Sequence, residues 1–194
     1  KEGKEVWVLD RPNPAGRQID GVTLASGHES FVGAACVPMR HGLTLGEAAR
    51  WFVKTFSLDV KLEVVPMQGY DPTADGFGWP KERTWVNPSP NAASLNMARC
   101  YPGTVVLEGT TLSEGRGTTI PLEVIGAPDL DMNEVLQEAS KLAPNWMKGA
   151  YIRPCWFEPT FHKHTGELCS GLQIHADFSG YLPGQFAPYR MIAG

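Results

Sequence analysis

Two hydrophobic periods along the chain predict short strands that alternate with helices. Residues 5–9 (Glu-Val-Trp-Val-Leu) form an apolar run after a charged segment, which is typical of a short buried strand. Residues 58–66 alternate between apolar and charged positions, as expected for a half-buried strand. Further strands are expected at residues 104–107, 150–157 and 172–176.

Capping patterns predict where the helices begin. Thr44 and Glu47 form a T-x-x-E capping box before a helix over residues 45–56, which places apolar side chains on one face. Asp131 and Glu134 form a second box before a helix over residues 135–142.

A third, shorter helix is expected after Asn91, which would cap it. It would end near Tyr101, because the Pro102-Gly103 pair that follows is a common stop signal.

Glycine and proline are abundant and predict many ordered loops. The 194 residues include 21 glycines and 16 prolines, nearly a fifth of the chain, against roughly 12% in an average protein. Residues 69–90 have no clear period and carry Trp79 and Trp85, which predicts a long functional loop. The expected fold class is α/β to α+β, with a small mixed sheet, flanking helices and long ordered loops.

Composition excludes several classes of protein. Hydrophobic residues make up 42% and charged residues 20%, which is typical of a folded domain and too apolar for a disordered chain. The net charge of −4 does not fit nucleic-acid binding. No stretch approaches the roughly 20 apolar residues that a membrane-spanning helix needs.

The two ends and the cysteines add two expectations. The chain begins with a charged segment directly before a strand and ends within what resembles the start of a helix, so we expect a fragment at both ends. The cysteines show no C-x-x-C spacing and are expected as small buried or half-buried thiols, with disulfides as the less favoured alternative: Cys36, Cys100, Cys155 and Cys169.

The densest group of polar residues lies at residues 107–119. Glu108 and Glu114 supply two carboxylates and Arg116 a cation, among three glycines that allow close approach to a ligand. Two carboxylates in different environments are what a glycosidase uses. The alternative, which the residues alone favour, is a structural ion pair between Glu114 and Arg116 that holds a glycine-rich turn.

Other candidate sites are weaker. Arg40 and His41 precede a predicted helix start, where an anionic group would bind, although a histidine bonded to a loop carbonyl is the simpler interpretation. His162 and His164 would share one face of a strand and suggest a metal, but no carboxylate-rich partner set accompanies them, so we predict no metal. Trp79 and its aromatic neighbours fit either a sugar-stacking surface or a small core within the loop.

Several motifs in a fixed order resemble the exo-β-N-acetylmuramidase family, long described as a bacterial domain of unknown function. They are Asp10-Arg11-Pro12-Asn13-Pro14, Ser30-Phe31-Val32-Gly33, Arg40-His41-Gly42-Leu43-Thr44, Pro88-Ser89-Pro90-Asn91, Tyr101-Pro102-Gly103-Thr104, Glu108-Gly109-Thr110-Thr111-Leu112-Ser113-Glu114-Gly115-Arg116-Gly117-Thr118-Thr119 and Gly166-Glu167-Leu168-Cys169-Ser170-Gly171. The resemblance covers essentially the whole chain.

The resemblance implies a bacterial cell-wall glycosidase, expected outside the cytoplasm, that releases N-acetylmuramic acid from the non-reducing end of peptidoglycan fragments without a cofactor. It also implies two domains: residues 1–20 as the last strand and turn of a truncated Rossmann-like domain, and residues 21–194 as a mixed α/β domain. The expected partners are a peptidoglycan-derived saccharide and the N-terminal half of the family fold, which would carry a further catalytic acid. The alternative is a non-catalytic sugar-binding or structural domain that supports that half.

The resemblance also implies roles for individual residues. Glu114 is expected as the carboxylate at the sugar with Glu108 in support, while substrate contacts are expected from Arg116, Arg40, His41, Asn91 and Trp79. One departure concerns Asp20, because the family usually carries glutamate there. The aspartate is one methylene shorter, which would move a catalytic carboxylate back by about 1.5 Å.

Overall fold

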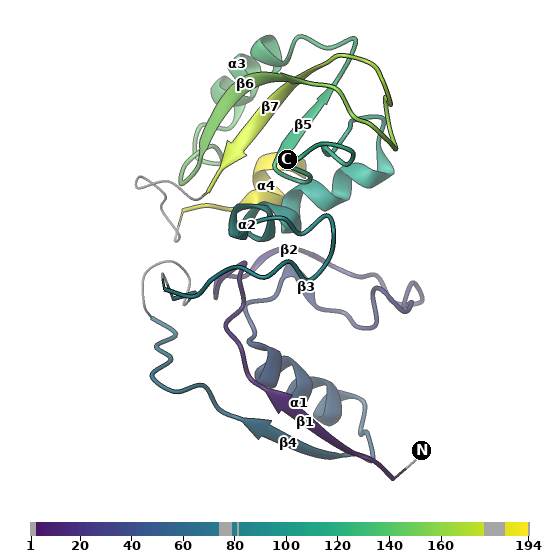
Figure 1. Ribbon diagram of the computed structural model, residues 1–194, viewed down its shortest axis with the longest axis vertical. Helices are drawn as coiled ribbons and strands as arrows, with labels where there is room; N and C mark the ends of the chain where they lie inside the picture. The colour runs from purple at the N-terminus through teal and green to yellow at the C-terminus, as the bar shows by residue number, and fades with distance from the viewer. Residues whose placement is uncertain (1–2, 74–78, 81, 177–184, 194) are drawn as a thin grey trace.

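The computed structural model describes residues 3–73, 79–80, 82–176 and 185–193. Its strands form three small sheets, and Figure 1 shows them spaced along an elongated molecule. Strands β1 (Glu5–Leu9) and β4 (Lys61–Val65) lie at one end, β2 (Asp20–Thr23) and β3 (Pro38–Arg40) in the middle, and the third sheet at the other end. This confirms the mixed α/β class, with three sheets in the described part of the chain where one was expected.

The first sheet pairs β1 and β4 in parallel, with Glu5 opposite Lys61, and α1 (Leu45–Thr55) packs against both strands. The capping box at the start of α1 is confirmed, because the Glu47 amide donates to Thr44 Oγ1 at 3.2 Å and the Thr44 amide to Glu47 Oε2 at 2.9 Å. The expectation that β1 is buried is wrong: Trp7 is 60% and Leu9 64% exposed. A single helix covers one face of this two-stranded sheet and leaves side chains on the other in solvent.

The third sheet is antiparallel in the order β5 (Val124–Ala127), β7 (Cys169–His175), β6 (Tyr151–Phe157). Every residue of β5 is buried, and Cys169 and Ile174 of β7 are at most 1% exposed, so this sheet carries the main core. Helix α3 (Met132–Leu142) packs against β7, and α2 (Leu95–Thr104) packs against the terminal helix α4 (Pro188–Ala193). Asp131 caps α3 as expected, accepting from the amides of Asn133 and Glu134.

Helix α2 differs from the prediction at both ends. Ser94, not Asn91, caps it by accepting from the Met97 amide at 2.8 Å. The sequence predicted a stop at Pro102 and Gly103, but the helix continues through both residues. It does so because Gly103 packs directly against α4, where an added Cβ would lie 2.1 Å from the Pro188 carbonyl oxygen. The helix packing thus outweighs the local stop signal.

The strand expected at residues 104–107 is also wrong. Thr104 ends α2, and residues Val105–Gly109 form a 3₁₀ helix, η2. Thr104 Oγ1 donates to the Leu122 carbonyl at 2.9 Å, which ties the end of the helix to the segment before β5. The segment with His162 and His164, expected on a strand, lies in turns between β6 and β7.

The described part of residues 69–90 contains neither helix nor strand, in agreement with the expected loop. All four cysteines are free thiols, as the favoured interpretation expected, but Cys36 is exposed where a buried or half-buried thiol was predicted. No helix in the described ranges has the length and apolar character needed to cross a membrane. The division of the chain at residue 20 stays a prediction; β1 on one side of that boundary has its strand partner β4 on the other.

Candidate active site

The motif of residues 107–119 folds into a compact loop against β5. Ser113 and Gly126 exchange both backbone hydrogen bonds in an isolated bridge, at 2.8 and 3.1 Å. Gly117 has a positive φ of 87°, and a Cβ there would lie 2.6 Å from the Phe161 carbonyl oxygen. The loop therefore needs glycine to pack against the β6–β7 turn, which brings residues 160–164 to the motif.

Glu114 lies at the centre of this contact and is 1% exposed. Its Oε2 accepts from the Lys163 ammonium at 3.1 Å, while its Oε1 lies 3.2 Å from Arg116 Nε and 3.5 Å from His162 Nδ1. The family resemblance implies that this carboxylate lies at the sugar. In the structure it has protein partners on its two oxygens and almost no contact with solvent.

Glu108 occupies a different environment on the same cation. Arg116 donates to Glu108 Oε1 through Nε at 3.1 Å and also through Nη2. The Glu108 side chain is 43% exposed, so it is the motif carboxylate that a ligand can reach. Arg116 thus pairs with two carboxylates, of which Glu114 is buried and Glu108 is partly exposed. Both expectations are therefore met: a structural ion pair and two carboxylates in different environments.

Lys163 and His162 were not predicted as site residues. The Lys163 ammonium donates to the carbonyls of Leu107 and Leu112 at 2.7 and 2.8 Å as well as to Glu114. These partners lie about 50 residues away in sequence, so no local spacing announces the contact. The only signal was the His-Lys-His triplet, which indicates a metal more readily than an ammonium anchor.

The structure gives no support to a metal at the two histidines. His164 Nε2 lies 2.8 Å from the Thr111 carbonyl oxygen, whereas His162 faces Glu114. Within the described ranges, no three side chains of histidine, cysteine, aspartate or glutamate are grouped as metal ligands.

Asp20 and Arg40 form a second group on β2 and β3, where they are paired in register. Asp20 is 5% exposed and accepts from the Tyr189 amide at 2.8 Å. Arg40 is 2% exposed and donates to the carbonyls of Ala15 and Phe186 and to Gln18. Both residues line a polar cavity of about 480 Å³, but their observed contacts tie β2 and β3 to the segment around α4.

The remaining predicted residues lie elsewhere. His41 Nδ1 accepts from the Leu43 amide at 3.1 Å, and burial lowers the pKa of the imidazole, which fits a neutral ring in a loop. Trp79 packs against Trp85 with ring centroids 5.4 Å apart, and Trp85 donates to the Ala92 carbonyl next to Asn91. This pair supports a small core within the loop.

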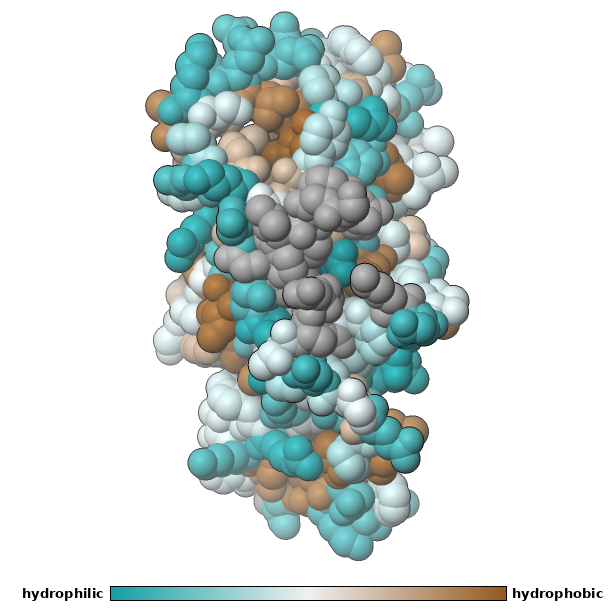
Figure 2. Space-filling view, turned by 90° about the vertical axis from the view of Figure 1, so that its left-hand side faces the viewer, coloured by the Kyte–Doolittle hydropathy of each residue, from teal (hydrophilic) through white to brown (hydrophobic). Residues whose placement is uncertain are grey.

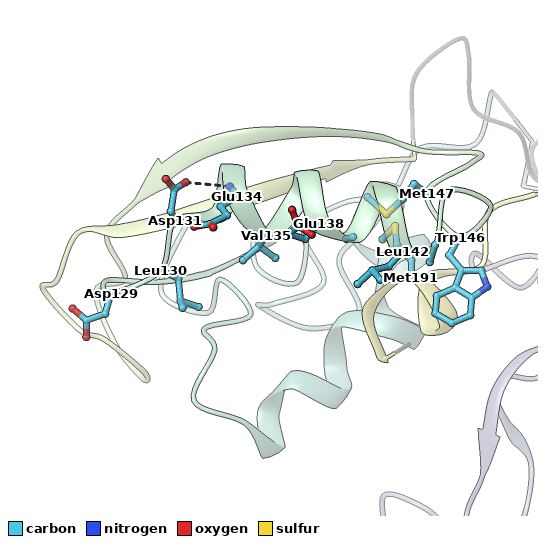
Figure 3. A pocket seen from close by; sticks show the side chains of 12 residues that line it. Asp129, Leu130, Asp131, Glu134, Val135, Glu138, Leu142, Trp146, Met147 and Met191 are labelled. Carbon is cyan, nitrogen blue, oxygen red and sulfur yellow. Dashed lines mark hydrogen bonds between the residues drawn. The ribbon is translucent and has the colours of Figure 1, made fainter.

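Another cavity, of about 580 Å³, runs along α3 and holds none of the predicted site residues. Figure 3 shows Leu142, Trp146, Met147 and Met191 gathered at one end of it, while Asp129 points away at the other. Figure 2 shows apolar side chains in a hollow near the end of the molecule that carries the three-stranded sheet. Its chemistry differs from that of the charged motif.

Known proteins match the chain along almost its whole length. The profile of the N-terminal domain of exo-β-N-acetylmuramidase NamZ matches residues 1–96, and that of the C-terminal domain matches residues 99–193. The chain is 41% identical over 176 residues to peptidoglycan β-N-acetylmuramidase NamZ of Bacillus subtilis (strain 168). That match covers 90% of this chain and 41% of the relative, so the chain spans about two fifths of the relative's length.

Two crystal structures of DUF1343 family proteins from Bacteroides fragilis NCTC 9343 share the fold. One has a TM-score of 0.77 at 27% identity and covers 97% of this chain and 48% of its own. The other has a TM-score of 0.66 at 26% identity, with 98% and 56% covered. The two profiles together account for nearly every residue, and the chain belongs to the exo-β-N-acetylmuramidase NamZ family.

Proposed function

We propose that this chain forms part of a glycoside hydrolase that releases N-acetylmuramic acid from the non-reducing end of peptidoglycan fragments. The observation that carries the proposal is the arrangement of Glu108, Arg116 and Glu114 in a chain of the NamZ family. The similar Bacillus subtilis protein is named a peptidoglycan β-N-acetylmuramidase, which supplies the substrate class.

In this proposal Glu108 is the motif carboxylate that meets the sugar. Its side chain is about half exposed, and the guanidinium of Arg116 fixes its direction through two donors. Arg116 in turn forms an ion pair with the buried Glu114. A carboxylate oriented in this way is suited to stabilise positive charge that develops at the anomeric carbon.

The exposed face of the first sheet fits a partner surface. Trp7 and Leu9 on β1 are well over half exposed, and β1 and β4 are the only strands of their sheet in the described chain. Parallel strands are normally covered on both faces. We propose that the rest of the family fold covers this face, because the chain spans only about two fifths of its Bacillus subtilis relative.

The test uses a chromogenic β-N-acetylmuraminide. The chain is assayed alone and joined to the part of the Bacillus subtilis relative that it does not cover. We expect at least one of these two proteins to release the chromophore. In that protein, Glu108→Gln should lower kcat/KM by about 100-fold, which is typical of a lost carboxylate at the reacting centre.

The matched control is Glu138→Gln, which removes an exposed glutamate that pairs with Lys141 on α3. It is expected to leave kcat/KM unchanged. No release from either protein would contradict the proposed function. Release that survives Glu108→Gln within threefold would remove Glu108 from it.

A further inference from the structure

One oxygen of the buried Glu114 carboxylate has no hydrogen-bond partner. Oε2 accepts from Lys163, whereas Oε1 is inaccessible to solvent and makes no hydrogen bond in the described structure. A buried acceptor of a charged group that makes no hydrogen bond has lost its contact with water without compensation, so such an atom calls for a reason. The donors nearest to it are Arg116 Nε at 3.2 Å and His162 Nδ1 at 3.5 Å.

His162 is held in a strained backbone conformation beside this oxygen. Its φ is 73°, a left-handed conformation that residues other than glycine rarely adopt. The next residue, Lys163, anchors the segment by donating to two motif carbonyls and Glu114, and His164 also has a positive φ of 55°. This backbone conformation directs Nδ1 of His162 toward Glu114, while the His162 side chain is 47% exposed.

We propose that Glu114 and His162 form a carboxylate–imidazole pair that supplies the acid of the proposed hydrolysis. This inference rests on the proposed function. Glu114 is the positioning residue: a small rotation of the ring brings Nδ1–H onto Oε1 and fixes which nitrogen carries the proton. His162 then presents Nε2 on the opposite side of its ring to the saccharide.

The charged side chains around Glu114 and His162 balance one another. Arg116 and Lys163 face Glu114, and Glu108 faces Arg116, so two cations balance two carboxylates before His162 is counted. On the same turn, His164 lies 3.8 Å from Glu167. A proton on His162 therefore carries the one positive charge beyond this balance.

The chemical step balances with water as the second reactant. Protonated His162 gives its Nε2 proton to the glycosidic oxygen as the bond from that oxygen to the anomeric carbon breaks. Water adds to the anomeric carbon and its proton returns to His162 Nε2. The products are the free sugar and the shortened fragment, and the pair ends as it began.

Nuclear magnetic resonance of the histidine side chains in this chain tests the pair without any activity. We expect neutral His162 to carry its proton on Nδ1, and this tautomer preference to weaken in Glu114→Gln, because an amide can donate to the ring as well as accept from it. His164→Gln, two residues away with similar backbone geometry, should leave His162 unchanged. A proton on Nε2 of neutral His162 in the parent protein would overturn the pair.

Turnover of the muraminide tests the chemical role. We expect His162→Gln to lower kcat at least 100-fold with little change in KM, and Glu114→Gln to lower kcat by a smaller factor, because the acid remains but is no longer oriented. His162→Gln changes a half-exposed side chain, so it decides the matter if Glu114→Gln fails to fold.

The two proposals fail in different ways. Turnover within threefold of the parent in His162→Gln overturns the inference and leaves the proposed function standing. A parent protein that releases no sugar overturns the proposed function, and the acid role of His162 with it, whatever the resonance experiment finds.

Discussion

The ammonium of Lys163 lies 3.1 Å from Oε2 of Glu114 and joins the β6–β7 turn to the motif of residues 107–119. Both side chains are largely buried, at 19% and 1% exposed. The same ammonium also donates to two motif carbonyls, so its donors are satisfied by these carbonyls and by Oε2 of Glu114. This contact explains why a motif rich in glycine and charge can hold one shape.

Replacing Lys163 by methionine should destabilise the protein strongly. The change keeps most of the side-chain volume but removes the cation that pairs with the buried Glu114 carboxylate. We expect the free energy of unfolding to fall by about 3 kcal/mol, as when one partner of a buried ion pair is lost. Urea unfolding measures it.

The control for this change is Lys141→Met, which removes an exposed ion pair with Glu138 on α3. An exposed pair of this kind contributes about 0.5 kcal/mol or less. If the two variants lost similar free energy, the buried role of Lys163 would be refuted.

Gly117→Ala should separate the motif from the β6–β7 turn. Its φ of 87° disfavours any side chain, and the new Cβ would lie 2.6–2.8 Å from backbone atoms of Thr160 and Phe161. We expect a loss of about 1–3 kcal/mol in the free energy of unfolding. Gly109→Ala, where no atom lies within 4 Å of the added Cβ, should be tolerated; equal losses in the two variants would contradict this packing.

His41 should make stability depend on pH. Burial lowers the pKa of the folded imidazole below its ordinary value of 6.5, so the unfolded chain takes up a proton at a higher pH than the folded protein. The unfolded state then binds more protons below about pH 6.5, and the free energy of unfolding falls as the pH drops through that range.

The measurement compares urea midpoints of the parent and His41→Asn from pH 7.5 to 5.5. Asparagine retains an acceptor for the Leu43 amide but no titrating group. We expect the parent to lose more stability on acidification than the variant. Parallel pH dependences would show that His41 binds its proton equally well in both states.

The four free thiols should differ sharply in reactivity. Cys36 is exposed, while Cys100 and Cys169 are 0% exposed, and burial raises the pKa of the thiols of Cys155 and Cys169. At pH 7.5 a disulfide reagent such as DTNB should modify one thiol rapidly in the native protein and all four in urea. Cys36→Ser should abolish the fast phase; a fast phase that persists would place the reactive thiol elsewhere.

Local rules predicted those elements whose signals lie within a few residues. The capping box at Thr44 placed the start of α1, and the alternating pattern of residues 58–66 placed β4. Asp131 caps α3 as predicted, although the helix begins at Met132, three residues before the expected range. Local rules were wrong at Gly103, where a close contact with α4 lets a helix continue through a proline and a glycine. They were also wrong for the burial of β1, which depends on what covers the sheet and not on the strand's own residues.

The order and identity of residues are enough to recognise the family and the motif that carries Glu108, Glu114 and Arg116, so both could be predicted without coordinates. The folded arrangement was needed to learn which carboxylate is buried and that Lys163 and His162 lie beside it. Burial and charge pairing depend on contacts between segments about 50 residues apart, and those contacts form only when β5, β6 and β7 come together in one sheet.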